Sequence, residues 1–400
     1  MKNIFEPCSI GNLTLKNRII RAATHEGMAH RDGLPMDDLL RTYQNLAAGG
    51  AGAIITGYAS VKQNGRTFPN MLMFDNDTYI PVYKSINDQL KQFKTPIILQ
   101  IAHGGSRSMS KITGQDVISA SRRKKNDYGD AVKEASEAEI RSIIGAFVAA
   151  IVRAKAAGFD GVELHAAHGY LLSEFVSPVL NKRRDQWDGS TENRLRIVTE
   201  IISSARTAVG SSFPIFVKLS GHDEFKRGLA EAEAIKIARI LQTASCDAIE
   251  VSCGYGDFMY TIRMPKVPVD AVLGIMPQYR DMPGYQKRLF RLMAPFLAKV
   301  HAPLYNYNVP LAEHIKRNVD IPVIAVGGIR SLQDIRTIIS DKGIDFVSLS
   351  RPFIIEPDIV NRFQQGQESS RCINCGYCLI GVTANKLRCY YGRIPASGIK

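Results

Sequence analysis

The sequence predicts a (β/α)8 TIM barrel with a short cysteine-rich C-terminal extension, and three observations lead to this fold class. A short apolar strand recurs eight times, helical stretches separate the strands, and the first strand is not followed by G-x-G-x-x-G. That glycine pattern is the usual mark of the rival architecture, an open doubly wound sheet. Near-continuous apolar strands alternating with helices indicate a parallel sheet covered on both faces, and eight such units over roughly 350 residues fit a closed barrel.

The eight strands can be followed in chain order. They read "RIIRAA", "GAIITG", "PIILQIAH", "GVELHAA", "PIFVKLSG", "DAIEVSCG", "PVIAVGG" and "DFVSLSRP", and begin near Arg18, Ala51, Pro96, Gly161, Pro214, Ala248, Pro322 and Phe346. The helix in "IRSIIGAFVAAIVRAKAAG" is the most clearly bounded. Ser136 and Glu139 match a capping box ahead of it, and Gly158 can end it with left-handed backbone.

Two segments leave this pattern. The longest irregular stretch, from about Tyr255 to Val319, follows the sixth strand and carries five Met and many basic residues, so we expect an excursion over the barrel mouth. From about Gln364 onward the alternation stops and a cluster of cysteines begins. The expected organisation is therefore a barrel over residues 1–363 and a cysteine-rich tail over 364–400.

Composition and charge narrow the class of protein. The chain has 400 residues, 45% of them hydrophobic, and a net charge of +13. Its Lys and Arg residues are scattered, without a basic helix, zinc-finger spacing or RNP-like motif, so an anionic small molecule is favoured over nucleic acid. The N-terminus lacks a signal-peptide pattern, and the longest apolar run, Ile143 to Val152, is about half of a membrane span. We expect a cytoplasmic protein with no membrane partner; oligomeric state is not readable.

Polar residues stand where the predicted strands end, which is the catalytic face of such a barrel. The fourth strand ends in "VELHAAHGYLLSEF", with His165, His168 and Tyr170 within six positions. A single histidine at a strand end is usually structural, whereas two histidines and a tyrosine on this face indicate function. Gln100 and Lys218 lie at the ends of the third and fifth strands.

The last two strands end in a pattern typical of a phosphate site. Strand seven ends in Gly327–Gly328 and strand eight in Ser350–Arg351. Glycines that expose backbone N–H groups, a helix start after "GGIRS" and a guanidinium suit an anion. Taken alone "VGGI" is weak, since it is also compatible with a tight turn.

These motifs together resemble the Old Yellow Enzyme family of FMN-dependent oxidoreductases, in the branch that contains the barrel domain of 2,4-dienoyl-CoA reductase. The resemblance covers nearly the whole barrel, in order. It runs through "IFEPCSIGNLTLKNRI", "AGGAGAIITG", "LQIAHGGSRS", "GVELHAAHGYLLSEFVSPVLNKRRDQWDGSTENRLR", "VKLS", "IPVIAVGGI" and "FVSLSRPFIIEPD".

The resemblance implies a role for each candidate residue. His165 and His168 would hydrogen-bond the carbonyl oxygen of the substrate, and Tyr170 would be the proton donor. The residues expected to bind FMN fall into three groups: Gln100 and Lys218 at the pyrimidine ring; Ala23, Thr24, His25 and Gly57 around the isoalloxazine; and Gly327, Gly328, Ser350 and Arg351 at the phosphate. His25 departs from the Thr, Cys or Gly of many relatives, and either tunes the flavin or is simply held by a neighbouring carbonyl.

The chemistry of the reaction agrees with these roles. Reduction of an activated C=C bond delivers a hydride to the β-carbon and a proton to the α-carbon. Two imidazole N–H donors can stabilise the negative charge that builds on the carbonyl oxygen, and a phenol is protonated at neutral pH. Because no side chain stores a hydride, a flavin must supply it.

The tail reads C-x2-C-x2-C-x10-C, formed by Cys372, Cys375, Cys378 and Cys389. Clustered cysteines in a chain of this kind indicate a metal site more than a disulfide scaffold. The reductase relatives carry a [4Fe–4S] ligand set here with slightly longer spacings, so we expect a [4Fe–4S] cluster. A four-cysteine zinc site and four reduced thiols without a metal are the alternatives.

The leading functional hypothesis is an ene-reductase acting on an α,β-unsaturated carbonyl compound, including enoyl or dienoyl thioesters. An amine or steroid dehydrogenase of the same family and an electron-transfer flavoprotein subunit are the alternatives. An electron carrier would need none of the two histidines and the tyrosine, which favours the enzyme. The electron donor is NAD(P)H or an electron-transfer protein.

Overall fold

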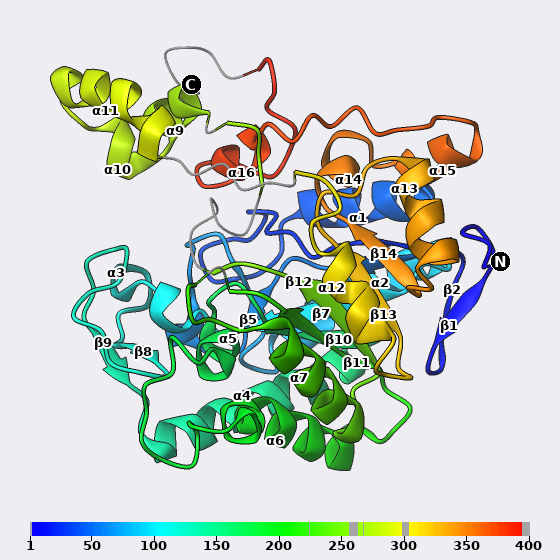
Figure 1. The fold of residues 1–400 in the computed structure, drawn as a ribbon, viewed down its shortest axis with the longest axis horizontal. Helices are drawn as coiled ribbons and strands as arrows, with labels where there is room; N and C mark the ends of the chain where they lie inside the picture. The colour runs from blue at the N-terminus through cyan, green and yellow to red at the C-terminus, as the bar shows by residue number, and fades with distance from the viewer. Residues whose placement is uncertain (1, 224, 256–262, 267, 298–303, 394–400) are drawn as a thin grey trace.

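A computed structural model describes residues 2–223, 225–255, 263–266, 268–297 and 304–393 (Figure 1). Eight parallel strands form a closed barrel, in the order β10-β11-β12-β13-β14-β3-β4-β7 with β7 paired back to β10. The strands are β3 (Ile19–Arg21), β4 (Ala53–Ile55), β7 (Ile97–Ala102), β10 (Gly161–Ala166), β11 (Ile215–Ser220), β12 (Ala248–Ser252), β13 (Val323–Val326) and β14 (Phe346–Leu349). All eight strands and the barrel fold expected from the sequence are confirmed.

Side chains along each strand point alternately out of and into the barrel, and this divides the core into two parts. Outward-facing residues such as Ile19 and Leu99 pack against the helices in one large cluster. Inward-facing residues such as Ile98 and Phe216 fill the lower barrel in a second cluster, to which the hairpin of β1 (Cys8–Ile10) and β2 (Leu13–Leu15) contributes. Because successive side chains point to opposite faces, the next inward positions after Ile98 and Phe216 are Gln100 and Lys218. The barrel interior therefore changes from apolar to polar toward the carboxyl ends of its strands.

Helices follow the strands as the pattern requires. They are α1 (Asp37–Ala48), α2 (Tyr79–Leu90), α3 (Ser110–Thr113), α4 (Glu137–Ala156), α5 (Leu171–Val176), α6 (Thr191–Val209), α7 (Glu231–Thr243), α12 (Val309–Lys316), α13 (Leu332–Arg336), α14 (Arg351–Ile355) and α15 (Ile359–Gln364). The capping box of α4 is confirmed, since Ser136 and Glu139 bond each other's backbone N–H. Gly158 follows that helix at φ 76°, as expected for its left-handed end.

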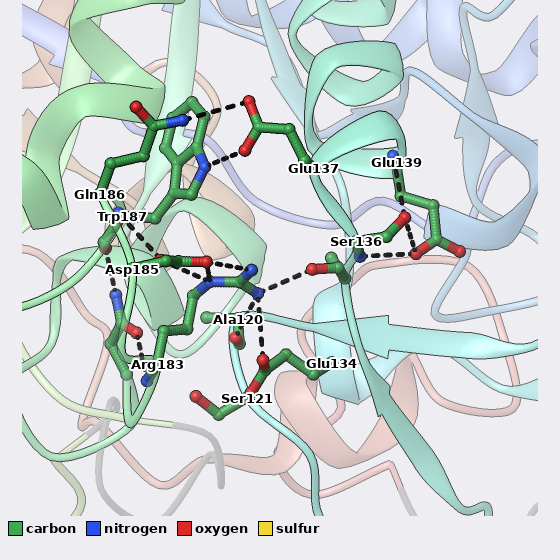
Figure 2. Close-up of polar contacts among 12 residues, drawn as sticks. Ala120, Ser121, Glu134, Ser136, Glu137, Glu139, Arg183, Asp185, Gln186 and Trp187 are labelled. Carbon is green, nitrogen blue, oxygen red and sulfur yellow. Dashed lines mark hydrogen bonds and ion pairs between the residues drawn. The ribbon is translucent and has the colours of Figure 1, made fainter.

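An ion-pair network fixes the chain after α5 (Figure 2). The Arg183 guanidinium donates to the carbonyls of Ala120 and Ala135, at 3.1 and 2.7 Å, and pairs with Asp185 at 2.7 Å. These carbonyls flank the two-stranded sheet of β8 (Val117–Ser119) and β9 (Val132–Glu134). The network therefore joins the loop beyond the histidines to an excursion from β7, and both segments border the barrel mouth.

The stretch from about Tyr255 to Val319 differs from the sequence-based expectation. Its described residues are largely helical: α9 (Val269–Ile275), α10 (Pro277–Arg280), α11 (Gly284–Leu297) and the barrel helix α12. Residues 256–262, 267 and 298–303 lie outside the described part of the chain. In Figure 1, α9, α10 and α11 form a group beside α16 (Tyr377–Gly381), where Val272 and Ile275 of α9 cluster with Ile380 of α16. Apolar residues of this stretch therefore form a local core with α16.

The tail is tied to the barrel through one buried carboxylate. Glu356 accepts from the Ser370 hydroxyl and from the Arg371 backbone N–H, both at 2.8 Å, and from Gln367 at 2.9 Å. The cysteine-bearing residues thus begin from a fixed point on the barrel. Among the helices that the structure describes, none combines the length and apolar character needed to cross a bilayer.

Candidate functional site

A polar ladder lines the barrel interior below the mouth. Lys218 on β11 lies between two carboxylates, with its Nζ 2.5 Å from Glu250 Oε2 on β12 and 3.6 Å from Glu163 Oε2 on β10. Gln100 on β7 donates to Glu163 Oε2 at 3.1 Å, and the Ser348 hydroxyl on β14 donates to Glu250. Five strands thereby hold Gln100 and Lys218 in place.

The protonation of this ladder follows from its burial. Burial raises the pKa of Glu163 to about 8, so its carboxyl is largely neutral at pH 7. Burial alone would lower the pKa of Lys218, but Glu163 and Glu250 outweigh it and raise that pKa above its ordinary value. The arrangement is best described as a Lys218–Glu250 ion pair beside a protonated Glu163.

His165, His168 and Tyr170 come together directly above the ladder. The ring centroid of His165 lies 5.0 Å from that of His168 and 4.6 Å from that of Tyr170, both edge-on. His165 belongs to β10, while His168 sits in the following turn at φ 62°, its backbone N–H donating to Ser220 Oγ at 2.9 Å. The left-handed backbone at His168 turns the chain so that its ring packs beside that of His165.

Both imidazoles are neutral. Burial lowers the pKa of His168 to about 3, and the positive charges of Lys218 and Arg107 add to this effect. Burial, with His168 and Lys218, also lowers the pKa of His165 well below its ordinary value. Two neutral rings can each donate one N–H bond without placing a full charge in the site.

Aromatic residues that the sequence analysis did not single out complete this pocket. Tyr170 Oη donates to Tyr58 Oη at 3.1 Å, and the Tyr58 hydroxyl lies 3.0 Å from Thr67 Oγ1. His25 stacks on Phe68, with ring centroids 4.9 Å apart, and lies 5.4 Å from Tyr58. Burial lowers the pKa of His25 to about 4, and its Nε2 has no hydrogen-bond partner in the described structure. The Asn70 side chain hydrogen-bonds the same ring and opposes part of this shift in pKa.

The residues expected around a flavin ring lie at the ends of β3 and β4. Ala23 and Thr24 follow β3, and the Thr24 hydroxyl lies 2.9 Å from Ser350 Oγ after β14. Gly57 follows β4 and has a packing reason of its own, since a Cβ there would overlap the Glu26 carboxylate. Its N–H donates to Glu26 Oε1 at 2.9 Å.

The expected phosphate residues gather at the ends of β13 and β14. Gly327 and Gly328 adopt φ values of 128° and 74°, and a Cβ on Gly328 would lie 2.6 Å from the Leu304 carbonyl oxygen. Arg351 donates to the carbonyls of Arg263 and Asn374, at 3.0 and 3.4 Å.

A further arginine, Arg330, joins this group although the sequence analysis did not select it. It donates to the Cys372 carbonyl and stacks over Tyr305 at 4.5 Å, and its Nε is buried without a hydrogen-bond partner in the described structure. Its place two residues beyond the glycine pair was the signal available in the sequence.

The four tail cysteines border one hollow of about 380 Å³, which includes open solvent and which Arg351 and Arg371 also line. All four are free thiols. Burial raises the pKa of Cys378 to about 12 and also raises that of Cys372. Within the described ranges, no three His, Cys, Asp or Glu side chains are arranged to hold a metal ion. The structure therefore brings the four residues to one place without converging their sulfur atoms.

Charged residues of the segment between β7 and α4 contact α5. Arg123 pairs with the buried Glu174 at 3.1 Å and donates to the Tyr255 hydroxyl. Glu174 also accepts from Ser119 at 2.8 Å. Sequence reasoning missed this cluster because its members come from three separate segments.

Comparison with known proteins gives the family. The model of the NADH:flavin oxidoreductase / NADH oxidase family matches residues 3–265 and 293–370, which leaves out most of the α9–α11 group. An NADH oxidase of Thermoanaerobacter brockii is 32% identical over 97% of this chain, which spans only 55% of that relative's length. A 4,4'-dithiodibutanoate disulfide reductase of Rhodococcus erythropolis is 30% identical, with 94% of this chain and 92% of the relative covered.

Solved structures agree in fold. An old yellow enzyme homologue from Zymomonas mobilis superimposes with a TM-score of 0.74 at 22% identity, covering 96% of this chain and 97% of the other. A 2-naphthoyl-CoA reductase complex gives 0.79 at 22% identity, covering 96% of this chain and 56% of the other. The family expected from the sequence is confirmed: the chain belongs to the NADH:flavin oxidoreductase / NADH oxidase family, the Old Yellow Enzyme family, and is an FMN-dependent oxidoreductase.

Proposed function

We propose that the chain is an ene-reductase, which reduces the C=C bond of an α,β-unsaturated carbonyl compound, enoyl and dienoyl thioesters included. The observation that carries this proposal is the convergence of His165, His168 and Tyr170 on one point at the catalytic face of the barrel. A flavoprotein that only carried electrons would need no such group.

The residues present suit FMN. The buried Arg330 Nε lacks a partner, Arg351 contacts carbonyl oxygens rather than a carboxylate, and Gly327 and Gly328 carry no side chains, so a phosphate would complete this corner. Lys218 offers a cation where the pyrimidine ring would lie. FMN would supply the hydride that no side chain can store.

The two histidines would activate the substrate's carbonyl group. The Ala167 N–H donates to His165 Nδ1 at 3.3 Å, so the proton of this ring is on Nε2. His168 Nε2 lies 2.7 Å from Ser252 Oγ, and with the serine as donor its ring proton is on Nδ1. Two N–H groups fixed in this way stabilise an oxygen that gains negative charge.

Tyr170 would provide the proton. Its ring packs against His165 and its hydroxyl donates to Tyr58, which fixes the direction of the hydroxyl group. Transfer to the α-carbon would complete the reduction as a general-acid step. NAD(P)H or an electron-transfer protein would return the electrons; the Thermoanaerobacter relative, an NADH oxidase by name, favours the nicotinamide.

Anaerobic turnover with a panel of substrates tests this function. We expect the holoenzyme to convert 2-cyclohexen-1-one, crotonyl-CoA or 2,4-hexadienoyl-CoA into the saturated or partly reduced product, with NADH or NADPH consumed in equal amount. Flavin that is reduced by the nicotinamide and is not reoxidised by any of these compounds would reject the proposal. Oxidation of amines or steroids by the same protein would favour the dehydrogenase alternative.

For the tail we propose a [4Fe–4S] cluster held by Cys372, Cys375, Cys378 and Cys389, with zinc as the alternative. The four thiols border one hollow, Arg330 and Arg351 lie next to them, and the tail is anchored at Glu356. Thiolates are the standard ligands of such clusters, and binding would draw the sulfurs together and release their protons. Such a site needs a reducing compartment, so we also propose a cytoplasmic location and treat residues 364–400 as a separate cluster-binding part.

Metal analysis of protein purified without oxygen tests the cluster. We expect iron and acid-labile sulfide, about four of each per chain for this cluster type, and the loss of both in Cys372→Ser. The isolated cysteine variant Cys246→Ser serves as the control and should retain both. Zinc in place of iron, or neither metal, would contradict the proposal.

A further inference from the structure

Arg107 is a partly buried cation, and the carboxylate with which it pairs lies largely in solvent. Its side chain is 16% exposed, and its NH1 lies 3.3 Å from Asp127 Oδ2, whose own side chain is 72% exposed. A carboxylate hydrated to that degree compensates a buried charge poorly, and such pairs contribute little free energy.

The position of Arg107 relative to the reactive residues is fixed by hydrogen bonds. The 3₁₀ turn Gly105–Arg107 follows β7 and is joined to α5, since the Leu171 N–H donates to the His103 carbonyl at 3.0 Å and the Ser106 N–H donates to Glu174 at 3.2 Å. Tyr170 is the residue that immediately precedes α5. Arg107 is therefore held on the same side of the mouth as the proton donor.

The pKa of Arg107 agrees with this position. Burial opposes the charge on Arg107, but the hydroxyls of Tyr170, Tyr128 and Tyr255 and the Asp127 carboxylate together raise its pKa. The same guanidinium helps to lower the pKa of His168. Arg107 thus lies close enough to Tyr170 and His168 for its charge to affect them.

Other buried cations of this face are neutralised differently. Arg123 pairs with Glu174, which is fully buried, and Lys218 pairs with Glu250. Arg107 is also far from the phosphate residues around the barrel, because β4 and β3 separate β7 from β14 on one side, and β10, β11 and β12 separate it from β13 on the other. The flavin phosphate consequently cannot be its partner.

We propose that Arg107 binds a carboxylate group of the substrate. The preferred substrates are then α,β-unsaturated carbonyl compounds that carry a carboxylate in addition to the activating carbonyl group. The guanidinium offers a planar pair of donors that matches a carboxylate, which gives orientation as well as affinity. The proposal rests on the ene-reductase function above and adds the substrate class and a specificity-determining residue.

Matched ligands with and without the charge separate the two proposals. Binding is measured first, by titrating the oxidised holoenzyme with 3- and 4-hydroxybenzoate and their methyl esters and following the flavin absorbance, which needs no turnover. Turnover is measured with 3-oxocyclohex-1-ene-1-carboxylate and its methyl ester. The variants are Arg107→Gln, Asp127→Asn and, as a control for net charge, the exposed Lys124→Gln.

We expect the Arg107→Gln protein to lose about ten- to hundredfold in affinity and in kcat/KM for the carboxylates, the effect of one lost charge-assisted hydrogen bond, with the esters changed less than about threefold. Lys124→Gln should match the wild-type protein, and Asp127→Asn should bind the carboxylates as tightly or more tightly. Equal losses for acid and ester, or the same loss in Lys124→Gln, would overturn the proposal.

Two further measurements distinguish a substrate carboxylate from other partners of Arg107. A loss in Arg107→Gln confined to the KM for NADPH, with NADH unaffected, would assign the residue to the nicotinamide phosphate and overturn a substrate carboxylate. Failure of the wild-type protein to reduce both the acid and its ester would reject the ene-reductase function by itself, while an Arg107-dependent difference between hydroxybenzoate and ester would still support the anion site.

Discussion

Among single residues, we propose that Tyr170 donates the proton and that the two histidines activate the carbonyl group. Replacing Tyr170 by Phe removes the hydroxyl and keeps the ring that packs edge-on against His165. Flavin reduction by NAD(P)H should then be nearly normal, whereas reoxidation by an enone should slow by about 10²–10⁴, the usual effect of a lost general acid. Stopped-flow measurement of the two half-reactions checks this. Equal slowing of both would show that Tyr170 shapes the pocket and does not supply the proton.

The histidine pair has a signature in binding as well as in rate. A phenolate offers its oxygen to the same N–H donors that would stabilise the developing negative charge. His165→Ala and His168→Ala should therefore weaken phenol binding and raise the barrier to enone reduction by about 2.7–4 kcal/mol, comparable to a lost oxyanion donor. Spectral titration with 4-hydroxybenzaldehyde and single-turnover rates provide the measurements. Phenol affinity equal to wild type in both variants would mean that the rings are structural.

The buried ladder makes a prediction about pH. Burial raises the pKa of Glu163 from an ordinary 4.5 to about 8. Between these two pH values the Glu163 carboxyl keeps its proton in the folded protein and has lost it in the unfolded chain. Stability from this group is complete at low pH and falls as pH rises toward 8. Glu163→Gln, which keeps a neutral acceptor for Gln100, should reduce the decline in unfolding free energy between pH 5 and 8, measured by denaturant titration. A decline as steep as in the wild-type protein would show that Glu163 is ionised when folded.

The reactive residues were accessible from sequence to different degrees. His165, His168 and Tyr170 stand within six positions at a strand end, so one local pattern brings them together. Tyr58 contacts Tyr170 from the end of another strand, and this contact depends on barrel closure. Charged residues inside apolar strands, such as Glu250, were the signal that could have revealed the ladder.

At the scale of elements, the α9–α11 group and the tail form one packing unit. Ile380 of α16 is 1% exposed and contacts the apolar face of α9, in a cluster separate from the barrel core. Ile380→Ala should cost about 2–5 kcal/mol locally and increase amide exchange in residues 269–297 and 377–393, with the barrel strands unaffected. Hydrogen-exchange mass spectrometry measures this, with the exposed Ile373→Ala as the matched control. Unchanged exchange in the Ile380 variant would mean that the two segments are stabilised independently.

The barrel strands, which share a repeating pattern, could be predicted from the sequence. The helices added to the barrel, α9 to α11, could not. The eight strands follow from apolar runs between turns, since burial on both faces leaves little choice of residue. The α9–α11 group, most of which falls in the gap of the family match, buries a small apolar face against α16. A stripe of that kind, far from its partner in sequence, gives no local sign of what it will pack against.

At the scale of the whole molecule, polarity changes in one direction along the barrel axis. The β1–β2 hairpin and apolar side chains fill the lower barrel, the Lys218 ladder lies above them, and the reactive pocket lies at the top. On the rim, Arg330 and Arg351 contact carbonyls of the cysteine tail from the ends of β13 and β14. The proposed flavin phosphate site and the proposed cluster site would therefore share two side chains.

The central claim is that this pocket reduces an activated C=C bond, and an anaerobic single turnover tests it most directly. The holoenzyme is photoreduced, mixed with one equivalent of 2-cyclohexen-1-one, and analysed for flavin oxidation state and product. We expect one cyclohexanone to form per flavin reoxidised, with the rate lowered by about 10²–10⁴ in Tyr170→Phe. Flavin that stays reduced in the wild-type protein, or reoxidises without forming cyclohexanone, would contradict it.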